Sequence, residues 1–471
     1  MGEAGRSDYK LHSQTYMMGK TLFITIHDGS LARNILRSFV LELLLKEQDL
    51  QIGLLVPTEK ESLYEKEFGS ERIHVYPWSR QGERTFMEKV LSYLARNGLK
   101  TETVLTDQQT YSKKGLSFFV KRALTQIFGS SKIFHALIRW LDTFHLASLE
   151  MQTIFKRQMP DLLFATDLQN DLDLDAIAAA REGDVPVIGM IRSWDNPTSS
   201  AGLLRAIPDE LVVWSPYVKR QVVDIQHIPQ EIIRMVGIPQ YDWYVKEEIY
   251  QTREQFLKKF GIDPAKKMIL FAGIGSFLNP HEPEVAEIFS EALKTGDLPE
   301  NTVVLFRPHP AFGIDKDRIN ALGNVVFDNT VSGYSGKERS SWEMDRDNMA
   351  HLVNSLRHAD VVVTTASSVT MDAVAFGKPV VCVAFDGKTQ EPYWKSVKRF
   401  YHDYTHYIEI SKTKGFKIAN TKEELIRDIN VYLEHPEEDT EGRKRLFEEF
   451  IWKLDGHSAE RLVEVILKKV P

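Results

Sequence analysis

The sequence predicts an α/β protein made of two Rossmann-like domains, whose parallel sheets face a central cleft. Short apolar strands alternate with helical stretches along both halves of the chain, which is the pattern of parallel sheets flanked by helices. A chain of 471 residues is longer than one core usually supports, and its 43% of hydrophobic residues can build a core in each domain.

The first domain is predicted over residues 21–242, after a disordered leader at 1–20, and it carries a helical insertion at 113–150. Apolar runs predict its strands at 22–26, 52–56, 103–106, 162–166, 187–191, 211–214 and 233–236. The second domain spans 243–471, and its strands are predicted at 268–272, 303–306, 325–327, 361–364, 380–384 and 408–410. Whether the last helix packs back on the first domain is left open.

The composition indicates a large enzyme of a reducing compartment. A net charge of -7 argues against general nucleic-acid binding. The one cysteine, Cys382, lies in a buried-strand pattern, so the chain has no disulfide framework. No run of 18 apolar residues is present and the first 20 residues are polar, so neither a membrane span nor a signal peptide is expected. The expected location is the cytoplasm.

The most informative stretch is a strand that runs into two serines at the start of a helix. The strand at 361–364 and Thr365 precede Ser367 and Ser368. Hydroxyl groups and backbone N–H groups at a helix N-terminus can hold a phosphate or a diphosphate. Simple capping of the helix by serine is the alternative.

A second strand end carries cationic side chains. The strand at 303–306 runs into Arg307 and His309, and prolines flank His309 on both sides, while Gly273 follows the strand at 268–272. The ligand crevice of an open parallel sheet lies outside the carboxyl ends of its strands. We therefore expect these residues to meet the two serines around one anion, with a merely structural turn histidine as the alternative.

These motifs resemble the donor half of the GT-B glycosyltransferases. The Arg-Pro-His-Pro turn and the run Ser-Ser-Val-Thr-Met-Asp-Ala-Val-Ala-Phe-Gly-Lys-Pro are similar to motifs of three groups. These groups are the CDP-glycerol glycerophosphotransferases, the capsule polysaccharide (Kdo) transferases and the bacterial sialyltransferases. The resemblance is good over 268–385 and implies that His309, Ser367 and Ser368 hold the phosphate of a nucleotide-activated donor. The nucleotide it implies is a cytidine or uridine nucleotide.

The catalytic base is expected on a first-domain loop that faces the donor. In the turn after the strand at 22–26, His27 or Asp28 is placed to reach an acceptor hydroxyl, and Ser30 is placed to cap the next helix. The alternative is that Asp28 and Ser30 only cap that helix.

A second loop, at 191–199, contains Ser193, Trp194, Asp195 and Asn196 and is expected on the acceptor side. In the glycerophosphotransferases the matching place carries a Trp-His-Gly-Thr-Pro motif whose histidine is the base. Trp194 is kept here, but Asp195 replaces that histidine, which weakens glycerophosphate chemistry and favours sugar transfer with Asp195 as the base. Turn formation by Asp-Asn-Pro is the alternative.

A third loop, at 166–175, contains the Asp-x-Asp spacing with which GT-A transferases bind a divalent metal. It precedes an alanine-rich helix, where acidic residues compensate the helix dipole. Dipole compensation is the favoured interpretation, and no metal is expected to be required.

Two further segments remain open. Residues 116–149 mix aromatic and basic side chains, which is typical of a helix lying on an anionic membrane or holding a lipid-linked acceptor, with amphipathic core packing as the alternative. Residues 329–347 are loop-like and are compatible with a lid or a base-contacting loop.

The predicted function is therefore metal-independent transfer of a sugar from a nucleotide sugar to a hydroxyl of a surface glycan or glycolipid. The alternatives are CDP-glycerol-type phosphotransfer, a UDP-N-acetylglucosamine 2-epimerase-like activity, and a silent nucleotide-binding scaffold. Such a role belongs to polysaccharide biosynthesis for the cell envelope, at the inner face of the membrane.

Overall fold

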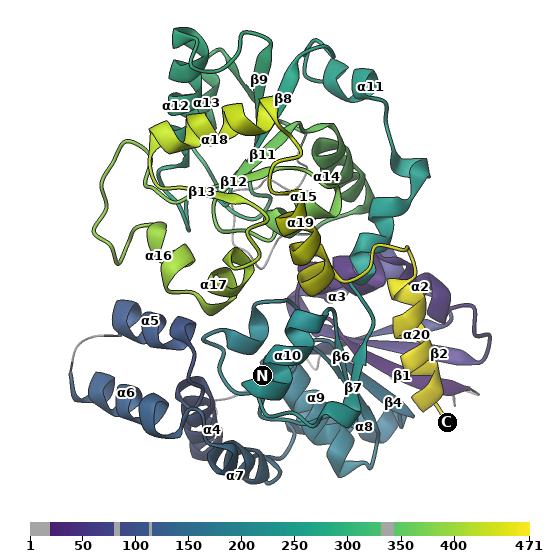
Figure 1. Ribbon diagram of the computed structural model, residues 1–471. Helices are drawn as coiled ribbons and strands as arrows, with labels where there is room; N and C mark the ends of the chain where they lie inside the picture. The colour runs from purple at the N-terminus through teal and green to yellow at the C-terminus, as the bar shows by residue number, and fades with distance from the viewer. Residues whose placement is uncertain (1–18, 80–84, 113–114, 331–342) are drawn as a thin grey trace, which may run out of the picture.

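The computed structural model describes residues 19–79, 85–112, 115–330 and 343–471. Two α/β units, each with one parallel sheet, lie against each other (Figure 1). The predicted leader at 1–20 falls almost entirely outside the described residues. Among the described residues, no helix is long and apolar enough to cross a membrane.

The first sheet has seven parallel strands in the order β3-β2-β1-β4-β5-β6-β7. Leu22 of β1 is aligned with Ile52 on one side and with Leu162 on the other. Side chains on both faces of the central strands are buried, as expected for a parallel sheet covered by helices on each face. The strands are β1 Lys20–Thr25, β2 Leu50–Pro57, β3 Ile73–Trp78, β4 Leu162–Ala165, β5 Val187–Met190, β6 Glu210–Val213 and β7 Ile233–Met235.

The second sheet has six parallel strands in the order β10-β9-β8-β11-β12-β13. Its valine-rich strand β11 lies between β8 and β12, with Val362 aligned with Leu270 and Val380. The strands are β8 Lys267–Ala272, β9 Thr302–Arg307, β10 Val325–Phe327, β11 Val361–Thr364, β12 Val380–Val383 and β13 Lys417–Ala419.

Helices flank both sheets. In the first half they are α1 Gly29–Leu31, α2 Phe39–Leu44, α3 Glu61–Phe68, α4 Phe86–Asn97, α5 Glu102–Tyr111, α6 Leu116–Phe128, α7 Lys132–Asp142, α8 Leu149–Gln158, α9 Asp171–Glu182 and α10 Pro216–Asp224. In the second half they are α11 Arg253–Lys258, α12 Glu282–Thr295, α13 Lys316–Asn320, α14 Arg346–His358, α15 Val369–Ala375, α16 Lys398–His402, α17 Thr405–Ser411, α18 Lys422–Glu434, α19 Thr440–Leu446 and α20 Ser458–Lys469.

Two strand predictions were wrong, because short apolar runs do not distinguish a strand from a helical turn. Residues 103–106 lie in α5, whose first turn is capped by the Thr101 hydroxyl accepting a hydrogen bond from the N–H of Val104. Residues 408–410 lie in α17, which buries Tyr407 and Ile410 at helical spacing. The strands β3 and β13 were missed, because both are edge strands with half-buried side chains and weak apolar patterns.

The last helix, α20, returns to the first domain and lies beside α2 (Figure 1). Leu462 and Ile466 of α20 are fully buried in the same apolar cluster as Leu22 and Ile24 of β1. The carboxylate of Asp242 accepts hydrogen bonds from the backbone N–H groups of Ser458 at 3.0 Å and Ala459 at 2.7 Å. The C-terminus therefore completes the core of the domain that begins the chain.

Shortening a buried side chain of α20 should destabilise the first domain. Leu462→Ala removes a fully buried side chain and leaves a cavity, so we expect its free energy of unfolding to fall by about 2–5 kcal/mol in urea denaturation. The exposed neighbour Lys468 forms an ion pair only with Glu464 within its own helix, so Lys468→Ala should change this free energy by less than about 0.5 kcal/mol. Equal effects of the two changes would mean that α20 does not stabilise the core.

Candidate functional site

Each sheet has one point at which the order of its strands reverses. In the first sheet this point lies between β1 and β4, and in the second it lies between β8 and β11. Ligands of open parallel sheets bind outside the carboxyl ends of the strands at such a switch point. The candidate site is therefore built from the loops that follow these four strands.

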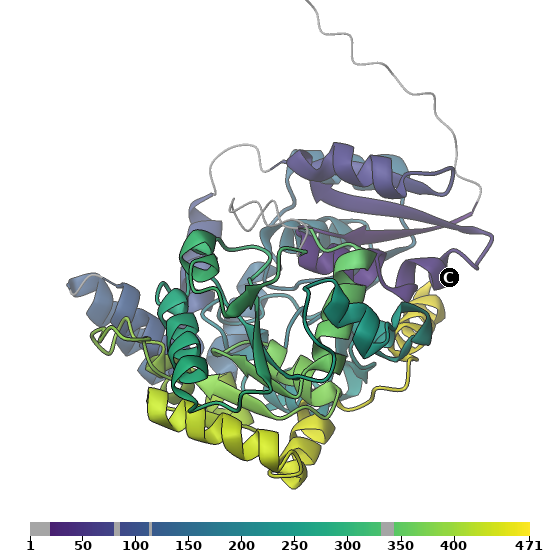
Figure 2. The same ribbon diagram turned by 90° about the horizontal axis from the view of Figure 1, so that it is seen from above.

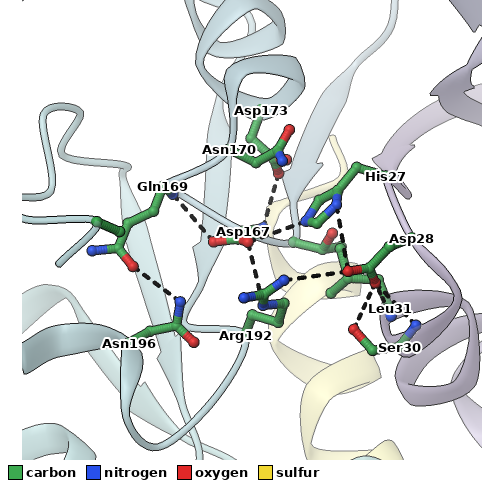
Figure 3. A network of polar contacts seen from close by, with 12 residues as sticks. His27, Asp28, Ser30, Leu31, Asp167, Gln169, Asn170, Asp173, Arg192 and Asn196 are labelled. Carbon is green, nitrogen blue, oxygen red and sulfur yellow. Dashed lines mark hydrogen bonds and ion pairs between the residues drawn. The ribbon is translucent and has the colours of Figure 1, made fainter. Parts of the chain in front are cut away.

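In the first domain, the loops after β1 and β4 bring His27 and Asp167 together (Figure 3). The His27 Nε2 atom lies 3.1 Å from Asp167 Oδ2, and its Nδ1 atom lies 3.6 Å from Asp28 Oδ2. His27 is thus held between two carboxylates. Such an imidazole can move a proton while the carboxylates stabilise its charged form.

A buried carboxylate fixes Asp167 in turn. Asp173, in the first turn of α9, accepts hydrogen bonds from the Asp167 N–H at 2.9 Å and from the Thr25 hydroxyl at 2.5 Å. Burial raises the pKa of Asp173 to about 7. Asp173 therefore holds the backbone of Asp167 in place through this hydrogen bond.

Asp28 acts mainly as a helix cap. Its Oδ1 atom accepts hydrogen bonds from the Ser30 and Leu31 N–H groups and from the Ser30 hydroxyl. Burial alone would raise the pKa of Asp28, but the His27 charge, the Ser30 hydrogen bond and the Arg192 charge lower it to about 2. The structure thus favours capping for Asp28, because so weak a base accepts a proton poorly at neutral pH.

The pKa of His27 is shifted in the opposite direction. Burial lowers it, but the hydrogen bond to Asp167 and the charges of Asp28, Asp167 and Asp173 outweigh burial and raise it above its ordinary value. Arg192 contacts the same two carboxylates, with Nη1 3.3 Å from Asp28 Oδ2 and Nε 3.4 Å from Asp167 Oδ2 (Figure 3). His27 and Arg192 therefore share the carboxylates of Asp28 and Asp167.

A pocket of about 430 Å³ adjoins this cluster at the carboxyl ends of the first-domain strands. Its lining residues come from the ends of β1, β2 and β3 and from the loop after β4, and they combine one imidazole, one indole and two carboxylates with small polar groups. They are His27, Pro57, Glu59, Trp78, Ser79, Asn170, Asp171 and Leu172. Rings and carboxylates of this kind suit a hydroxyl-bearing ligand.

The loop at 191–199 lies at the contact between the two domains. Trp194 is buried, and its ring lies 4.9 Å from His406 and 5.7 Å from Tyr407, both of α17. The Asn196 side chain donates to Gln169 Oε1 at 3.0 Å (Figure 3). Burial raises the pKa of Asp195, but the His406 charge, a hydrogen bond from Ser193 and the Arg192 charge lower it overall. Asp195 does not line the 430 Å³ pocket.

In the second domain, the predicted donor residues lie at the ends of β8, β9 and β11. Ser368 precedes α15 without a side-chain capping bond, whereas the Ser367 hydroxyl accepts a hydrogen bond from the Val369 N–H at 3.3 Å. The Tyr407 hydroxyl donates to the Ser367 carbonyl at 2.7 Å. Because Tyr407 also contacts Trp194, the Ser-Ser turn lies close to the first-domain loop.

Thr365 and Gly273 border this turn. The hydroxyl of Thr365 is buried and has no hydrogen-bond partner in the part of the chain that the structure describes. Gly273 leaves no room for a side chain, since a Cβ atom there would lie 2.9 Å from Glu282 Oε2. The Glu282 carboxylate fills this space and accepts hydrogen bonds from the Ile274 and Gly275 N–H groups, so Gly273 serves the packing of Glu282 at the end of β8.

His309 and Arg307 occupy different environments. The Ala311 N–H donates to His309 Nδ1 at 3.0 Å, which leaves Nε2 to carry the proton of the neutral ring. Arg307 is buried beneath the turn, 3.6 Å from Asp328, and burial lowers its pKa. Its Nη1 atom has no hydrogen-bond partner among the described residues. Arg307 therefore lies beneath the turn, where its positive charge can stabilise a bound anion.

The acidic side chains of the loop at 166–175 make structural contacts. Asp173 binds Thr25 and Asp167, and Asp175 accepts hydrogen bonds from Trp78 and from Ser148. No group of three His, Cys, Asp or Glu side chains in the described residues could hold a metal ion. The acidic residues Asp171 and Asp173 lie in the first turn of α9, where negative charge interacts favourably with the helix dipole.

The predicted loop 329–347 lies mostly outside the described residues, at 331–342. At its described end, Glu343 joins the two domains. Its carboxylate contacts Arg37 at 2.5 Å, Lys60 at 2.7 Å and the Tyr64 hydroxyl at 2.9 Å, all in the first domain. The lid interpretation stays a prediction.

Sequence reasoning missed the contacts of His27 and of Arg192 with Asp167. Asp167 stood in the loop examined for a metal, and its distance in sequence from His27 concealed their contact. The signal was the position of both residues directly after neighbouring strands, since β1 and β4 pair in the sheet.

A family model described as CDP-Glycerol:Poly(glycerophosphate) glycerophosphotransferase matches residues 203–468, which is more than half of the chain. No curated protein matches the sequence. The matched region contains the whole second sheet and the Arg307, His309, Ser367 and Ser368 positions. It begins after the loop that carries Asp195.

Several solved structures share the fold. A putative UDP-N-acetylglucosamine 2-epimerase from Listeria monocytogenes is 13% identical with a TM-score of 0.53, covering 95% of this chain and 96% of that chain. The UDP-GlcNAc 2-epimerase from Neisseria meningitidis, bound to UDP-GlcNAc, is 12% identical with a TM-score of 0.52, covering 95% of this chain and 100% of that chain. The predicted GT-B arrangement of two Rossmann-like domains is confirmed.

Removal of the Asp167 carboxylate should lower the pKa of His27. In Asp167→Asn, the hydrogen bond to a carboxylate and its charge are lost while burial remains, so the His27 titration should move to lower pH. The ion pair stabilises the fold below the ordinary histidine pKa, and this contribution is lost as pH rises through the raised folded-state pKa. NMR titration of ¹³C-labelled histidines measures the shift. The exposed His402 should titrate unchanged, and an unmoved His27 would contradict the pairing.

Proposed function

Because the chain belongs to the CDP-glycerol:poly(glycerophosphate) glycerophosphotransferase family, we propose that it transfers a group from a nucleotide-activated donor to a hydroxyl held in the 430 Å³ pocket. It is a transferase with the GT-B fold, as predicted. The group we favour is a sugar, and the acceptor a surface glycan or glycolipid. The observation that carries the proposal is the His27–Asp167 pair beside that pocket.

The second domain would hold the donor phosphate. His309 Nε2–H and the hydroxyls of Ser367 and Ser368 are hydrogen-bond donors, and Arg307 supplies positive charge from below. The buried Thr365 hydroxyl, which has no hydrogen-bond partner among the described residues, suits an oxygen-rich ligand. These groups would stabilise the leaving nucleotide without a metal ion.

The first domain would supply the base. His27 Nδ1 would take the proton from the acceptor hydroxyl as its oxygen attacks the donor carbon, while the bond from that carbon to the phosphate oxygen breaks. Asp167 and Asp28 would stabilise the resulting imidazolium. Asp195 remains the competing candidate, with Ser193, Trp194 and Asn196 shaping the acceptor side.

Glycerophosphate transfer is the second candidate, and the family match over 203–468 favours it. Against it stands Asp195, which replaces the motif histidine in the loop just before the matched region. The bond formed on the acceptor distinguishes the two reactions, since sugar transfer forms a glycosidic bond and glycerophosphate transfer forms a phosphodiester. Sugar transfer from a nucleoside diphosphate sugar releases a nucleoside diphosphate, whereas glycerophosphate transfer from CDP-glycerol releases CMP. An epimerase would instead change its nucleotide sugar without any acceptor.

The expected location at the inner face of the membrane is part of this proposal. Segment 113–149 is the expected contact, and residues 113 and 114 lie outside the described residues. The partners would be a nucleotide sugar and a glycan or lipid-linked acceptor, with no nucleic acid.

A nucleotide should stabilise the protein in the presence of EDTA. We expect one of CMP, CDP, UDP and GDP to raise the melting temperature, because hydrogen-bond donors and a cation already surround the phosphate position. His309→Ala and the double change Ser367→Ala, Ser368→Ala should abolish the shift. His435→Ala, at an exposed histidine of the same domain, should retain it. Stabilisation that requires added manganese would count against the metal-free site.

Loss of the base should reduce turnover without weakening donor binding. His27→Gln should lower kcat by about a hundredfold to ten-thousandfold, while the thermal shift with nucleotide stays unchanged. The surface variant His402→Gln should keep normal turnover. If Asp195→Asn lowers kcat and His27→Gln does not, Asp195 is the base and the His27 assignment is wrong.

A further inference from the structure

Eleven apolar side chains are exposed on α6, α7 and the chain that follows α7. These helices lie at the periphery of the first domain, well away from β8–β13 (Figures 1 and 2). The exposed fractions reach 82% for Leu116, 83% for Ile133 and 81% for Leu149. We call this set the apolar surface: Leu116, Phe119, Val120, Ile127, Phe128, Ile133, Leu137, Trp140, Phe144, Leu146 and Leu149.

The spacing shows that core packing does not account for the apolar surface. On α7, residues 133, 137 and 140 form one exposed stripe, whereas His135, Ile138 and Asp142 form the buried face. On α6, Phe118 and Thr125 are buried while residues on other faces stay exposed. The expected core packing therefore holds for Phe118 but not for the exposed aromatic residues. Exposed apolar areas of this extent mark an interaction site.

Residues 115–149 carry a net positive charge, whereas the whole chain carries a net negative charge. Residues 115–149 carry four basic side chains, Lys121, Arg122, Lys132 and Arg139, against the single acidic Asp142, although the chain has a net charge of -7. Asp142 is buried, whereas Lys132 is exposed. Basic residues beside exposed apolar ones complement an anionic lipid surface.

A pocket of about 570 Å³ opens beside Trp140, and guanidinium groups lie in its wall. Arg139 donates to the carbonyls of Leu204 and Gln226, and Arg181 donates to those of Asp142 and His145. Neither of these arginines forms an ion pair within the described ranges. Burial lowers the pKa of Arg139 to about 10, as for a charge that lacks a counter-ion.

The other charged side chains of the pocket form an ion pair or a hydrogen bond, or are exposed to water. Arg205 pairs with Asp142 at 3.4 Å, and Asp209 accepts a hydrogen bond from the Val187 N–H. Asp184 and Asp209 are exposed to water near the mouth. Arg139 and Arg181 are therefore the groups that remain to bind an anion from outside. A phosphate is the anion whose geometry suits guanidinium groups.

We propose that the apolar surface inserts into an anionic phospholipid membrane and that Arg139 and Arg181 bind a lipid phosphate in the adjoining pocket. Insertion of Trp140 and Phe144 places the mouth of this pocket at the depth of the headgroups. This gives residue-level content to the membrane contact expected for the proposed function and adds a lipid site outside the cleft. The catalytic residues take no part in it.

Vesicle sedimentation tests the insertion. The full chain should bind vesicles of phosphatidylglycerol and phosphatidylcholine, and Trp140→Ser should weaken binding by about tenfold or more. Trp394→Ser is the matched control, because Trp394 is 53% exposed against 57% for Trp140 and lies in the second domain. It should bind as the unchanged chain does. Absence of vesicle binding by the unchanged chain, or equal losses in both variants, would overturn the proposal.

The pocket is tested by lipid preference. The unchanged chain should prefer vesicles with phosphatidylglycerol over pure phosphatidylcholine, and Arg181→Gln alone or with Arg139→Gln should reduce that preference by about threefold or more. Arg318→Gln, in the second domain, should not. An unaltered preference would exclude the pocket as the phosphate site. Since Arg139 bonds two carbonyls, the single Arg181→Gln change keeps the test valid if the double variant fails to fold.

Two further measurements separate this proposal from its competitors. The nucleotide thermal shift should be unchanged in Trp140→Ser and Arg181→Gln, so failure of the lipid site and failure of the donor site give different results. Sedimentation velocity should show the same mass for the unchanged chain and Trp140→Ser. A dimer that Trp140→Ser dissociates would show that a second copy covers the apolar surface, and the membrane proposal would fall.

Discussion

The relative position of the two domains depends on the short segment Pro239–Val245, where the chain first crosses between them. Asp242 binds the N-terminus of α20, which follows the second crossing, so a single carboxylate fixes both crossings. Tyr241 and Tyr244 donate to Asp372 of α15, and Trp243 donates to the Arg37 carbonyl of the first domain. The Ser-Ser turn and the His27 loop keep their separation because this segment contacts the elements beside both.

The two halves of the site use electrostatics differently. The first-domain half contains charges of both signs, with His27 and Arg192 set among Asp28, Asp167 and Asp173 (Figure 3). Such a cluster holds a proton near neutral pH, because burial and counter-charges oppose each other. The second-domain half contains the Thr365 hydroxyl and Arg307 Nη1, two buried polar atoms that have no hydrogen-bond partner among the described residues and that suit the proposed anionic ligand.

The apolar surface and the first-domain half of the candidate site are built from different parts of the first domain. The candidate site uses loops at the carboxyl ends of β1 to β5, whereas the apolar surface lies on helices inserted between β3 and β4. An insertion of this kind leaves the sheet unchanged, because the inserted helices pack on the domain with one face only. A transferase fold can thus gain a lipid contact without altering its catalytic loops.

The sequence by itself predicted the two parallel sheets, since valine-rich runs such as 361–364 and 380–384 are apolar on both faces, which is typical of central strands. It also predicted a donor half, because Arg307 and His309 lie at the end of β9 and Ser367 and Ser368 follow β11, and these two strands flank β8 in one sheet. The tertiary structure alone decided the partner of His27, since Asp167 is 140 residues away and reaches it only because β1 and β4 pair. It alone decided that Asp28 is a cap and that α7 exposes a stripe of apolar side chains. Burial and charge at such positions depend on neighbours that are distant in sequence, and local patterns do not record them.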